Sequence, residues 1–382
     1  MTRTSYLDHN ATTPLRPEAA AAVTEALAMT GNPSSVHRFG RHARRKIEAA
    51  REAVAALAGA RPEGVIFTSG GTEANNLALA GSGRKRILVS AGEHVSVLDA
   101  VPGGVRIPLT GEGLVEPATL DARLGESDAP ALVSIMLANN ETGAIQPVAE
   151  LARVARARGA LVHCDAVQAG GKLPLDLAAL GVDMISLSAH KLGGPPGVGA
   201  LVLAAEQELA PSQRGGGQER GRRAGTENLP GIAGFGAAAR AALAGLDEAA
   251  ALAGLRDELE RCLRNLAPEI RIFAAAVPRL ANTCCFAVPG LAAETQVVAL
   301  DLAGVAVSAG SACSSGKVAP SHVLAAMGAG AAAATAVRVS LGWTSEAADI
   351  ERFLEAWGAL YSRCAGAAHD APAAIPAVIP AA

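Results

Sequence analysis

The sequence is poor in aromatic side chains and has no excess of charge of either sign. Phe, Trp and Tyr make up 3% of its 382 residues, and 33 Lys and Arg face 36 Asp and Glu, for a formal net charge of −3. A chain balanced in this way lacks the basic surface that nucleic-acid binding requires, and it has no acidic tail. We therefore expect no direct nucleic-acid partner and a core filled mainly by small aliphatic side chains.

Cysteine pairs and long apolar runs are also missing. No two of the six cysteines have the CxxC spacing of metal and redox motifs, and none belongs to a secretory disulfide pattern. The first ten residues, MTRTSYLDHN, form no apolar signal region, and no run approaches the roughly 18 apolar residues of a membrane span. These absences predict no membrane contact, no resident metal site, and free thiols in a reducing cytoplasm.

What the sequence does have is an alternation of short apolar runs with alanine-rich helical patterns. Strand-like runs occur at 64–69, 86–90, 131–137, 160–165, 183–188 and 199–203, with helical patterns such as 72–80 and 148–158 between them. Strands separated by helices are typical of βαβ units and a largely parallel sheet. Ligands of such sheets bind at the carboxyl ends of the strands, where the motifs described below occur.

A second region follows a long helix or helix pair expected over 231–266. Strands are expected there at 282–288, 304–309 and 336–341, and helices at 295–302 and 345–359. We expect a large domain of residues 12–247 and a small domain of residues 1–11 and 248–365. The Ala- and Pro-rich residues 366–382 are expected to form a disordered tail.

A lysine and an acid at the ends of two strand-like runs indicate a cofactor. Lys191 lies in SLSAHKLGGPPGVGAL, and Asp165 lies in HCDAVQAGGK, 26 positions earlier (191 − 165). A lysine that forms a Schiff base, with a carboxylate that pairs with a pyridinium nitrogen, is the arrangement of pyridoxal-phosphate enzymes. The segment FTSGGTEANNLAL adds a glycine turn and a helix opened by Thr72, whose free N–H groups would favour a phosphate.

One cysteine has a distinctive setting. Cys313 lies in SAGSACSSG, where every neighbour is Gly, Ala or Ser, and a segment of this composition is flexible enough to carry a nucleophile between two sites. Cys284 and Cys285 lie in the strand-like NTCCFAVPG and are expected to be buried and inert. Cys164 precedes Asp165 on a strand, so its side chain should point away from the cofactor.

Together these motifs resemble the cysteine desulfurases of the NifS/IscS type, group I, in the class V aminotransferase family of fold-type I pyridoxal-phosphate enzymes. The matching blocks follow the family's order over roughly residues 5–345: YLDHNATTPL, GNPSSVHRFG, FTSGGTEANNLAL, LANNETGAIQP, HCDAVQ, SAHKLGGPPGVGAL, GGGQERGRRAGTEN, SAGSACSSG and VRVSLGW. The resemblance implies a large α/β domain with a mostly parallel seven-stranded sheet, and a smaller α+β domain.

The resemblance also implies a role for each matching position. Lys191 would bind the cofactor, Asp165 would pair with its ring nitrogen, and Gln168 would bond its ring hydroxyl oxygen. His94 would stack on the ring and shuttle a proton. The catalytic residues would be His94, Lys191 and Cys313. Four residues would hold the phosphate: Gly71, Thr72, Ser188 and His190. Thr226 would reach the phosphate of the neighbouring subunit in a homodimer. Asn140 and Arg338 would hold the substrate carboxylate.

The activity implied is conversion of L-cysteine to L-alanine, with the sulfur captured as a persulfide on Cys313. An iron–sulfur scaffold or another acceptor protein would take that sulfur, and Cys313 could serve as a transient cluster ligand. Three alternatives stay open: a selenocysteine lyase or other class V enzyme, an aminotransferase of the same fold, and a non-catalytic scaffold in sulfur transfer. The Cys313 segment disfavours the first two, and the presence of the whole residue set disfavours the third. The sequence does not distinguish general iron–sulfur assembly, nitrogenase maturation and tRNA thiolation.

Overall fold

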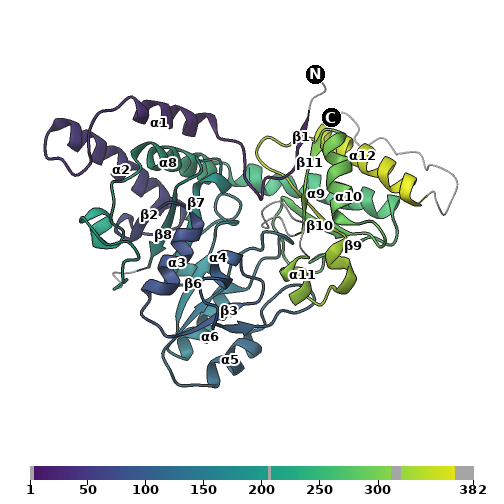
Figure 1. The fold of residues 1–382 in the computed structure, drawn as a ribbon, viewed down its shortest axis with the longest axis horizontal. Coiled ribbons are helices and arrows are strands. Elements are labelled where there is room, and N and C mark those ends of the chain that lie inside the picture. Colours follow the sequence, from purple (N-terminus) through teal and green to yellow (C-terminus); the bar gives the residue numbers. More distant parts are fainter. Residues whose placement is uncertain (1–3, 205–207, 311–319, 366–382) are drawn as a thin grey trace.

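The structure is a computed structural model of the chain, and it describes residues 4–204, 208–310 and 320–365. Cys313 and the predicted tail 366–382 lie outside the described residues. The described elements form two groups, each built on its own sheet. Figure 1 shows these groups side by side, with the N-terminal strand β1 (Ser5–Tyr6) lying among the C-terminal elements.

The larger group contains a seven-stranded sheet. Its strands, in spatial order, are β2 (Val65–Thr68), β8 (Gly199–Leu203), β7 (Met184–Ser188), β6 (Leu161–Asp165), β5 (Ala131–Ser134), β3 (Arg86–Ser90) and β4 (Val105–Ile107). Neighbouring strands are parallel except around β8, which runs antiparallel to both β2 and β7. The expected mostly parallel seven-stranded sheet is confirmed, while the antiparallel strand and the edge strand β4 are features that the sequence pattern did not predict.

The run expected as a strand over 131–137 is shorter in the structure, because β5 ends at Ser134. Its continuation still bonds to β6: Ile135 N donates to His163 O at 3.0 Å, and Leu137 N donates to Asp165 O at 2.9 Å. The apolar pattern therefore marks an extended buried segment, of which only the first part forms a regular ladder.

Helices cover both faces of the large sheet because its strands are apolar on both sides. On β2, Phe67 belongs to the core beneath α2 (Arg38–Leu57) and α8 (Leu229–Ala244), whereas Ile66 packs with α3 (Gly71–Gly81). The other helices of this group are α1 (Pro17–Leu27), α4 (Val95–Leu98), α5 (Pro117–Gly125), α6 (Val148–Ala157) and α7 (Leu177–Leu180). Alanine is abundant in the main core, in line with the scarcity of aromatic side chains.

The smaller group is built on an antiparallel sheet with the order β12 (Ser308–Ala309), β13 (Ala336–Ser340), β10 (Thr283–Ala287) and β9 (Arg271–Ile272). Its core contains Phe286, Phe353 and the fully buried Trp357. The helices here are α9 (Leu246–Leu266), α10 (Ala293–Leu302), α11 (His322–Ala326) and α12 (Ala347–Ala365). The single strand expected over 304–309 is wrong: β11 (Val305–Ala306) pairs with β1, and β12 pairs with β13 in another sheet.

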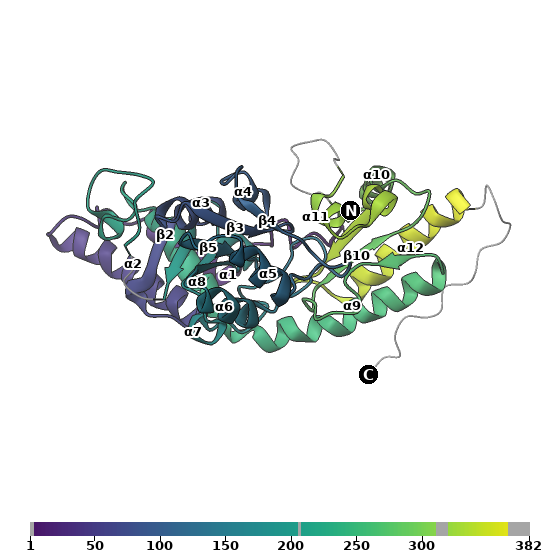
Figure 2. The ribbon, with the colours of Figure 1, turned by 90° about the horizontal axis from the view of Figure 1, so that it is seen from below.

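The long helical pattern over 231–266 is a pair of helices that meet at Gly245. Helix α9 leaves the large group and runs along the small one (Figure 2). Within residues 4–204, 208–310 and 320–365, no single helix is long and apolar enough to cross a membrane. Helices α8 and α9 reach the length and apolar composition of a membrane span only when they are taken together, and they are bent by 65° where they meet. The domain boundaries at residues 11 and 247 stay a prediction.

The N-terminal segment after β1 runs between the two groups and is hydrogen-bonded to each. His9 N donates to Ser340 O of β13 at 3.1 Å, and Thr13 N donates to His190 O in the turn after β7 at 3.1 Å. This segment therefore brings residues of the small sheet close to the carboxyl ends of the large sheet.

Candidate active site

A cavity of about 250 Å³ lies where several strands of the large sheet end. Its walls come from the segments that follow β2, β3, β5, β6 and β7, with contributions from the N-terminal segment and β13. The lining residues are Asn10, Ala11, Gly71, Thr72, Asn75, His94, Ser96, Met136, Ala138, Asn140, Asp165, Val167, Gln168, Ser188, His190, Lys191 and Arg338. Every predicted site residue that the structure describes is among them except Thr226, and Cys313 lies outside the described residues.

Lys191 ends a short 3-10 turn, Ala189–Lys191, directly after β7. Its amine donates to the backbone oxygens of Asn10 at 2.5 Å and Ala11 at 2.8 Å. Both acceptors belong to the N-terminal segment, so that segment fixes the direction in which the amine enters the cavity. A lysine amine at this position can act as a nucleophile towards an aldehyde and as a base.

Asp165 is the last residue of β6, the strand next to β7, and its side chain is buried. Its Oδ2 accepts a hydrogen bond from Asn75 Nδ2 at 2.7 Å, and its Oδ1 accepts one from Val167 N at 2.9 Å. The two donors hold the carboxylate in one orientation at the floor of the cavity. Asn75 lies one helical turn after Gly71 on α3, a spacing that could have identified it from the sequence.

His94 caps the N-terminus of α4. Its Nδ1 accepts a hydrogen bond from Ser96 N at 3.1 Å and lies 2.8 Å from Ser96 Oγ. Because Nδ1 is an acceptor here, the neutral ring carries its proton on Nε2. Burial lowers the pKa of His94, and the negative charge of Asp165 opposes this effect. The ring is therefore poised to be neutral near pH 7 and to exchange a proton through Nε2.

The phosphate cradle expected at the start of α3 lies on the wall of this cavity. The first turn of an α-helix leaves its N–H groups free and carries a positive partial charge, which together favour an anion. An added Cβ on Gly71 would lie 2.8 Å from Val167 Cγ2, and one on Gly199 would lie 2.6 Å from the Gly70 carbonyl carbon. Glycine is therefore required for this close approach of β8 and the turn.

Ser188, the last residue of β7, and His190 line the same part of the cavity as Thr72. His190 Nδ1 lies 3.2 Å from Thr12 Oγ1. Burial lowers the pKa of His190 to about 4, and the positive charges of Lys191 and Lys172 lower it further. The neutral imidazole can still act as a hydrogen-bond donor to an oxyanion.

Arg338 enters the cavity from β13 and is only 1% exposed. Its Nη1 donates to the backbone oxygen of Asn140 at 2.9 Å, and its Nη2 donates to Asp8 Oδ1 at 2.6 Å. Its Nε is buried and has no hydrogen-bond partner among the residues that the structure describes. A guanidinium that lines a cavity is well suited to bind a carboxylate.

Asn10 also lines the cavity, although the sequence did not single it out within the YLDHNATTPL block. Its backbone oxygen accepts from Gln168 Nε2 at 2.8 Å as well as from Lys191. The Oε1 of Gln168 accepts from Lys172 Nζ at 2.9 Å, which fixes the orientation of the amide. Sequence spacing cannot reveal this cluster, because Asn10 and Gln168 are 158 positions apart.

Thr226 is exposed and lines a separate hollow with Ser69 and Glu227. The described chain therefore does not bring it to the Lys191 cavity. Cys284 and Cys285 are buried as expected, and burial raises the pKa of both thiols, which keeps them protonated. In the part of the chain that the structure covers, no group of three or more His, Cys, Asp or Glu side chains is placed to hold a metal ion.

The chain that follows the Cys313 segment is tethered beside this cavity. Ser321 Oγ donates to Glu141 Oε2, and His322 Nε2 lies 2.9 Å from the backbone oxygen of Glu93. Glu141 follows Asn140 in sequence, and Glu93 precedes His94. Burial raises the pKa of Glu141 to about 7, against the opposing effects of Ser321 and the positive charge of Arg338. These contacts place Ser321 and His322 next to the neighbours in sequence of two predicted site residues, Asn140 and His94.

Comparison with known proteins gives a consistent result. The aminotransferase class-V family model matches residues 5–353. The chain is 43% identical over 371 residues to an IscS-like cysteine desulfurase of Mycobacterium tuberculosis, covering 92% of this chain and 94% of that protein. It is 47% identical over 366 residues to a cysteine desulfurase of Cereibacter sphaeroides, with the same coverage. The structure of a NifS-like protein from Rickettsia africae superposes with a TM-score of 0.88 at 35% identity, covering 94% of this chain and 100% of that one.

Proposed function

Because this chain belongs to the class V aminotransferase family, we propose that it is a cysteine desulfurase, a pyridoxal-phosphate enzyme that converts L-cysteine to L-alanine and captures the sulfur as a persulfide on Cys313. The observation that carries the proposal is the meeting of Lys191, Asp165 and Arg338 in one cavity with the N-terminus of α3. An amine, a carboxylate, a buried guanidinium and an anion cradle are the groups that such a reaction requires.

The donor set of the cavity fits pyridoxal phosphate. Lys191 would bind its aldehyde carbon, Asp165 would pair with its ring nitrogen, and Gln168 would donate to its ring hydroxyl oxygen. The phosphate would be held by the first turn of α3 and by polar side chains that face it: Gly71, Thr72, Ser188 and His190. When bound, the cofactor supplies an electron sink for the α-carbon of an amino acid.

The residues of the chain then have separate roles in the reaction. Arg338 and Asn140 orient the carboxylate of L-cysteine, and the Lys191 amine removes and returns the proton of the α-carbon. His94, neutral and protonated on Nε2, holds or exchanges a proton near the substrate thiol. The Cys313 thiolate attacks the substrate sulfur, so that an S–S bond forms while the C–S bond breaks. The electron pair of the broken bond stays on carbon, which takes a proton, and alanine leaves.

We also propose a homodimer in which Thr226 reaches the phosphate site of the partner subunit, since a single chain leaves Thr226 outside its own cavity. The persulfide would pass to an iron–sulfur scaffold or another sulfur-acceptor protein. Sedimentation of the purified protein measures the oligomeric state. A monomer with full activity would contradict the assignment of Thr226.

The function is tested by supplying the holoenzyme with L-cysteine and a reducing thiol, and by measuring alanine and sulfide. We expect equal amounts of the two products. A keto acid in place of alanine would indicate an aminotransferase, and turnover of selenocysteine without turnover of cysteine would indicate a selenocysteine lyase. If the purified protein retains no cofactor absorbance, a non-catalytic role becomes the better explanation.

A further inference from the structure

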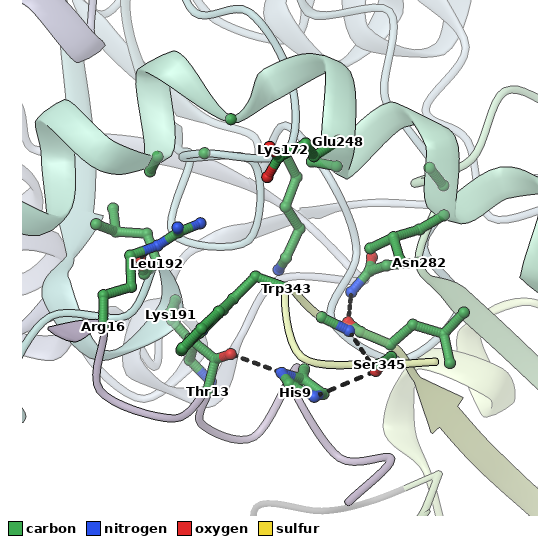
Figure 3. Close-up of a pocket in the computed structure, with 18 residues that line it drawn as sticks. His9, Thr13, Arg16, Lys172, Lys191, Leu192, Glu248, Asn282, Trp343 and Ser345 are labelled. Atoms are coloured by element: carbon green, nitrogen blue, oxygen red, sulfur yellow. Dashed lines mark hydrogen bonds between the residues drawn. The ribbon is translucent and has the colours of Figure 1, made fainter. Parts of the chain in front are cut away.

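A second cavity, of about 240 Å³, shares Lys191 with the first and has no other lining residue in common with it. It is enclosed by the N-terminal segment, the junction of α8 and α9, and the chain that follows β13 (Figure 3). Figure 3 shows Lys172, which belongs to the turn after β6, extending towards the centre of this cavity, with Arg16 on one side and Trp343 below. None of the proposed catalytic steps uses this space.

Arg16 brings a cation to this cavity and forms no ion pair at hydrogen-bonding distance among the described residues; the carboxylates of Glu18 and Glu248 act on it only through their charge. Its Nε donates to Leu192 O at 3.2 Å, and its guanidinium carbon lies 5.3 Å from the centre of the Trp343 ring. Within the described residues its two Nη groups have neither a hydrogen bond nor an ion pair. Arg16 is half-buried; burial lowers the pKa of its guanidinium, and the negative charges of Glu18 and Glu248 oppose this effect.

Lys172 is a second cation with no acidic partner in the described chain. Its amine donates to neutral oxygens only: Gln168 Oε1 at 2.9 Å, Gln168 O at 3.0 Å and Asn10 Oδ1 at 3.4 Å. Burial lowers its pKa to about 7, and the positive charges of Lys191 and Arg338 lower it further. Two cations that are withdrawn from water beside a single carboxylate, Glu248, leave an excess of positive charge that destabilises a fold, and an anion between them would offset that cost.

The remaining lining indicates what kind of anion fits. Leu252, Leu341 and Trp343 present apolar surface, whereas Thr13, Asn282 and Ser345 offer hydrogen bonds. A charged end with an apolar body matches a small organic acid better than a bare inorganic ion. Glu248 is the only acidic residue that lines the described cavity, so cations predominate there.

We propose that this second cavity binds a small organic carboxylate, whose oxygens are held by Arg16 and Lys172 and whose apolar part packs against Trp343 and Leu252. The site is separate from the proposed substrate-carboxylate site at Arg338. Since Lys172 also holds Gln168, and Lys191 lines both cavities, a ligand here contacts the groups that position the cofactor.

The test uses the holoenzyme and butyrate, which has no amino group and therefore cannot react with the cofactor. Trp343 is one of two tryptophans, and the other, Trp357, is fully buried in the small core, so a butyrate-dependent change in tryptophan fluorescence reports on Trp343. We expect saturable binding, with affinity at least about tenfold lower in Arg16→Gln and Lys172→Met, because each removes a charge-assisted hydrogen bond. The exposed Arg240→Gln on α8 is the matched control and should bind as wild type does.

Calorimetry adds a second measurement that does not depend on fluorescence. An anion beside Lys172 favours its ammonium form, so binding at pH 7.5 should take up protons, and the affinity should fall as the pH rises above about 7. The other ionisable groups facing Lys172 are His9, Arg16, Lys191, Glu248 and Arg338, and burial keeps His9 neutral with a pKa of about 4. Lys172→Arg, which keeps the charge, should bind butyrate without this pH dependence. Unchanged affinity in both Arg16→Gln and Lys172→Met would place butyrate elsewhere and overturn the proposal.

Discussion

Asn75 Nδ2 donates a hydrogen bond of 2.7 Å to Asp165 Oδ2 and a second one, of 2.9 Å, to Ser96 Oγ. Ser96 in turn contacts His94 Nδ1, so one amide connects the proposed partner of the ring nitrogen with the proposed proton carrier. Helix α3 therefore has two tasks. Its first turn faces the phosphate site, and its second turn holds the carboxylate and, through Ser96, the imidazole.

Asn75→Ala removes the hydrogen bond to the Asp165 carboxylate and should weaken cofactor binding. A hydrogen bond to a charged group contributes about 1.5–3 kcal/mol, which corresponds to roughly a 10- to 100-fold loss of affinity. The measurement is the cofactor absorbance that remains after dialysis against buffers of decreasing pyridoxal-phosphate concentration. Asn76→Ala, on the same helix but bonded to Thr72 O and Ser96 O, is the control. Equal retention by both variants would contradict the role of Asn75.

Lys191→Ala removes the amine that would bind the cofactor and move the α-proton. The variant should fold, because the hydrogen bonds of Lys191 to Asn10 O and Ala11 O leave the backbone of the N-terminal segment intact when they are lost, yet it should produce neither alanine nor sulfide. Product analysis over hours, together with far-UV circular dichroism, checks both statements. Turnover at the wild-type rate would remove Lys191 from the mechanism.

Cys313→Ala should separate cofactor chemistry from sulfur transfer. Cys313 lies outside the described residues, so this prediction rests on the sequence of its segment. The variant should bind the cofactor and change its absorbance on addition of L-cysteine, but it should release no sulfide. Cys364→Ala, which removes an exposed cysteine on α12, is the matched control and should keep full activity. Normal sulfide release by the Cys313 variant would rule out this thiol as the nucleophile.

Arg338→Lys keeps the positive charge but loses the planar fork and the unpaired Nε. We expect the KM for L-cysteine to rise by about tenfold or more, with a smaller effect on cofactor binding. Steady-state kinetics and cofactor titration give the two numbers separately. Arg352→Lys on α12 provides a comparison outside the cavity. If the KM stays unchanged, Arg338 has a structural role only.

Glu141 should make stability fall as the pH rises. Burial raises the pKa of its carboxyl to about 7, so the folded state keeps a proton that the unfolded state releases near the ordinary pKa of 4.5. The free energy of unfolding should therefore decrease between about pH 4.5 and pH 7, by up to roughly 3 kcal/mol. Glu141→Gln should remove this part of the pH dependence, measured by urea unfolding at pH 5.5 and pH 8. The exposed Glu150→Gln on α6 should behave as wild type does, and the same slope in both variants would contradict the prediction.

Much of the site could be predicted because its residues stand at the ends of apolar runs. Asp165 and Lys191 follow neighbouring strands of a parallel pair, and the carboxyl ends of such strands meet at one edge of the sheet. The glycine turn before α3 is equally visible in the sequence. The alternation of apolar runs and helices likewise predicted the mostly parallel sheet.

The sequence by itself therefore predicted the type of fold, the residues that we propose carry the chemistry and the strands that present them. The tertiary structure alone decided how those residues are held: Asn10 beside Gln168 and Lys191, Lys172 facing a second cavity, and β11 and β12 divided between two sheets. The physical reason is that periodicity and turn signals act over a few residues. These contacts instead join segments well beyond that range, from 30 positions apart for Ser308 and Arg338 (338 − 308) to 158 for Asn10 and Gln168, and only packing brings such segments together.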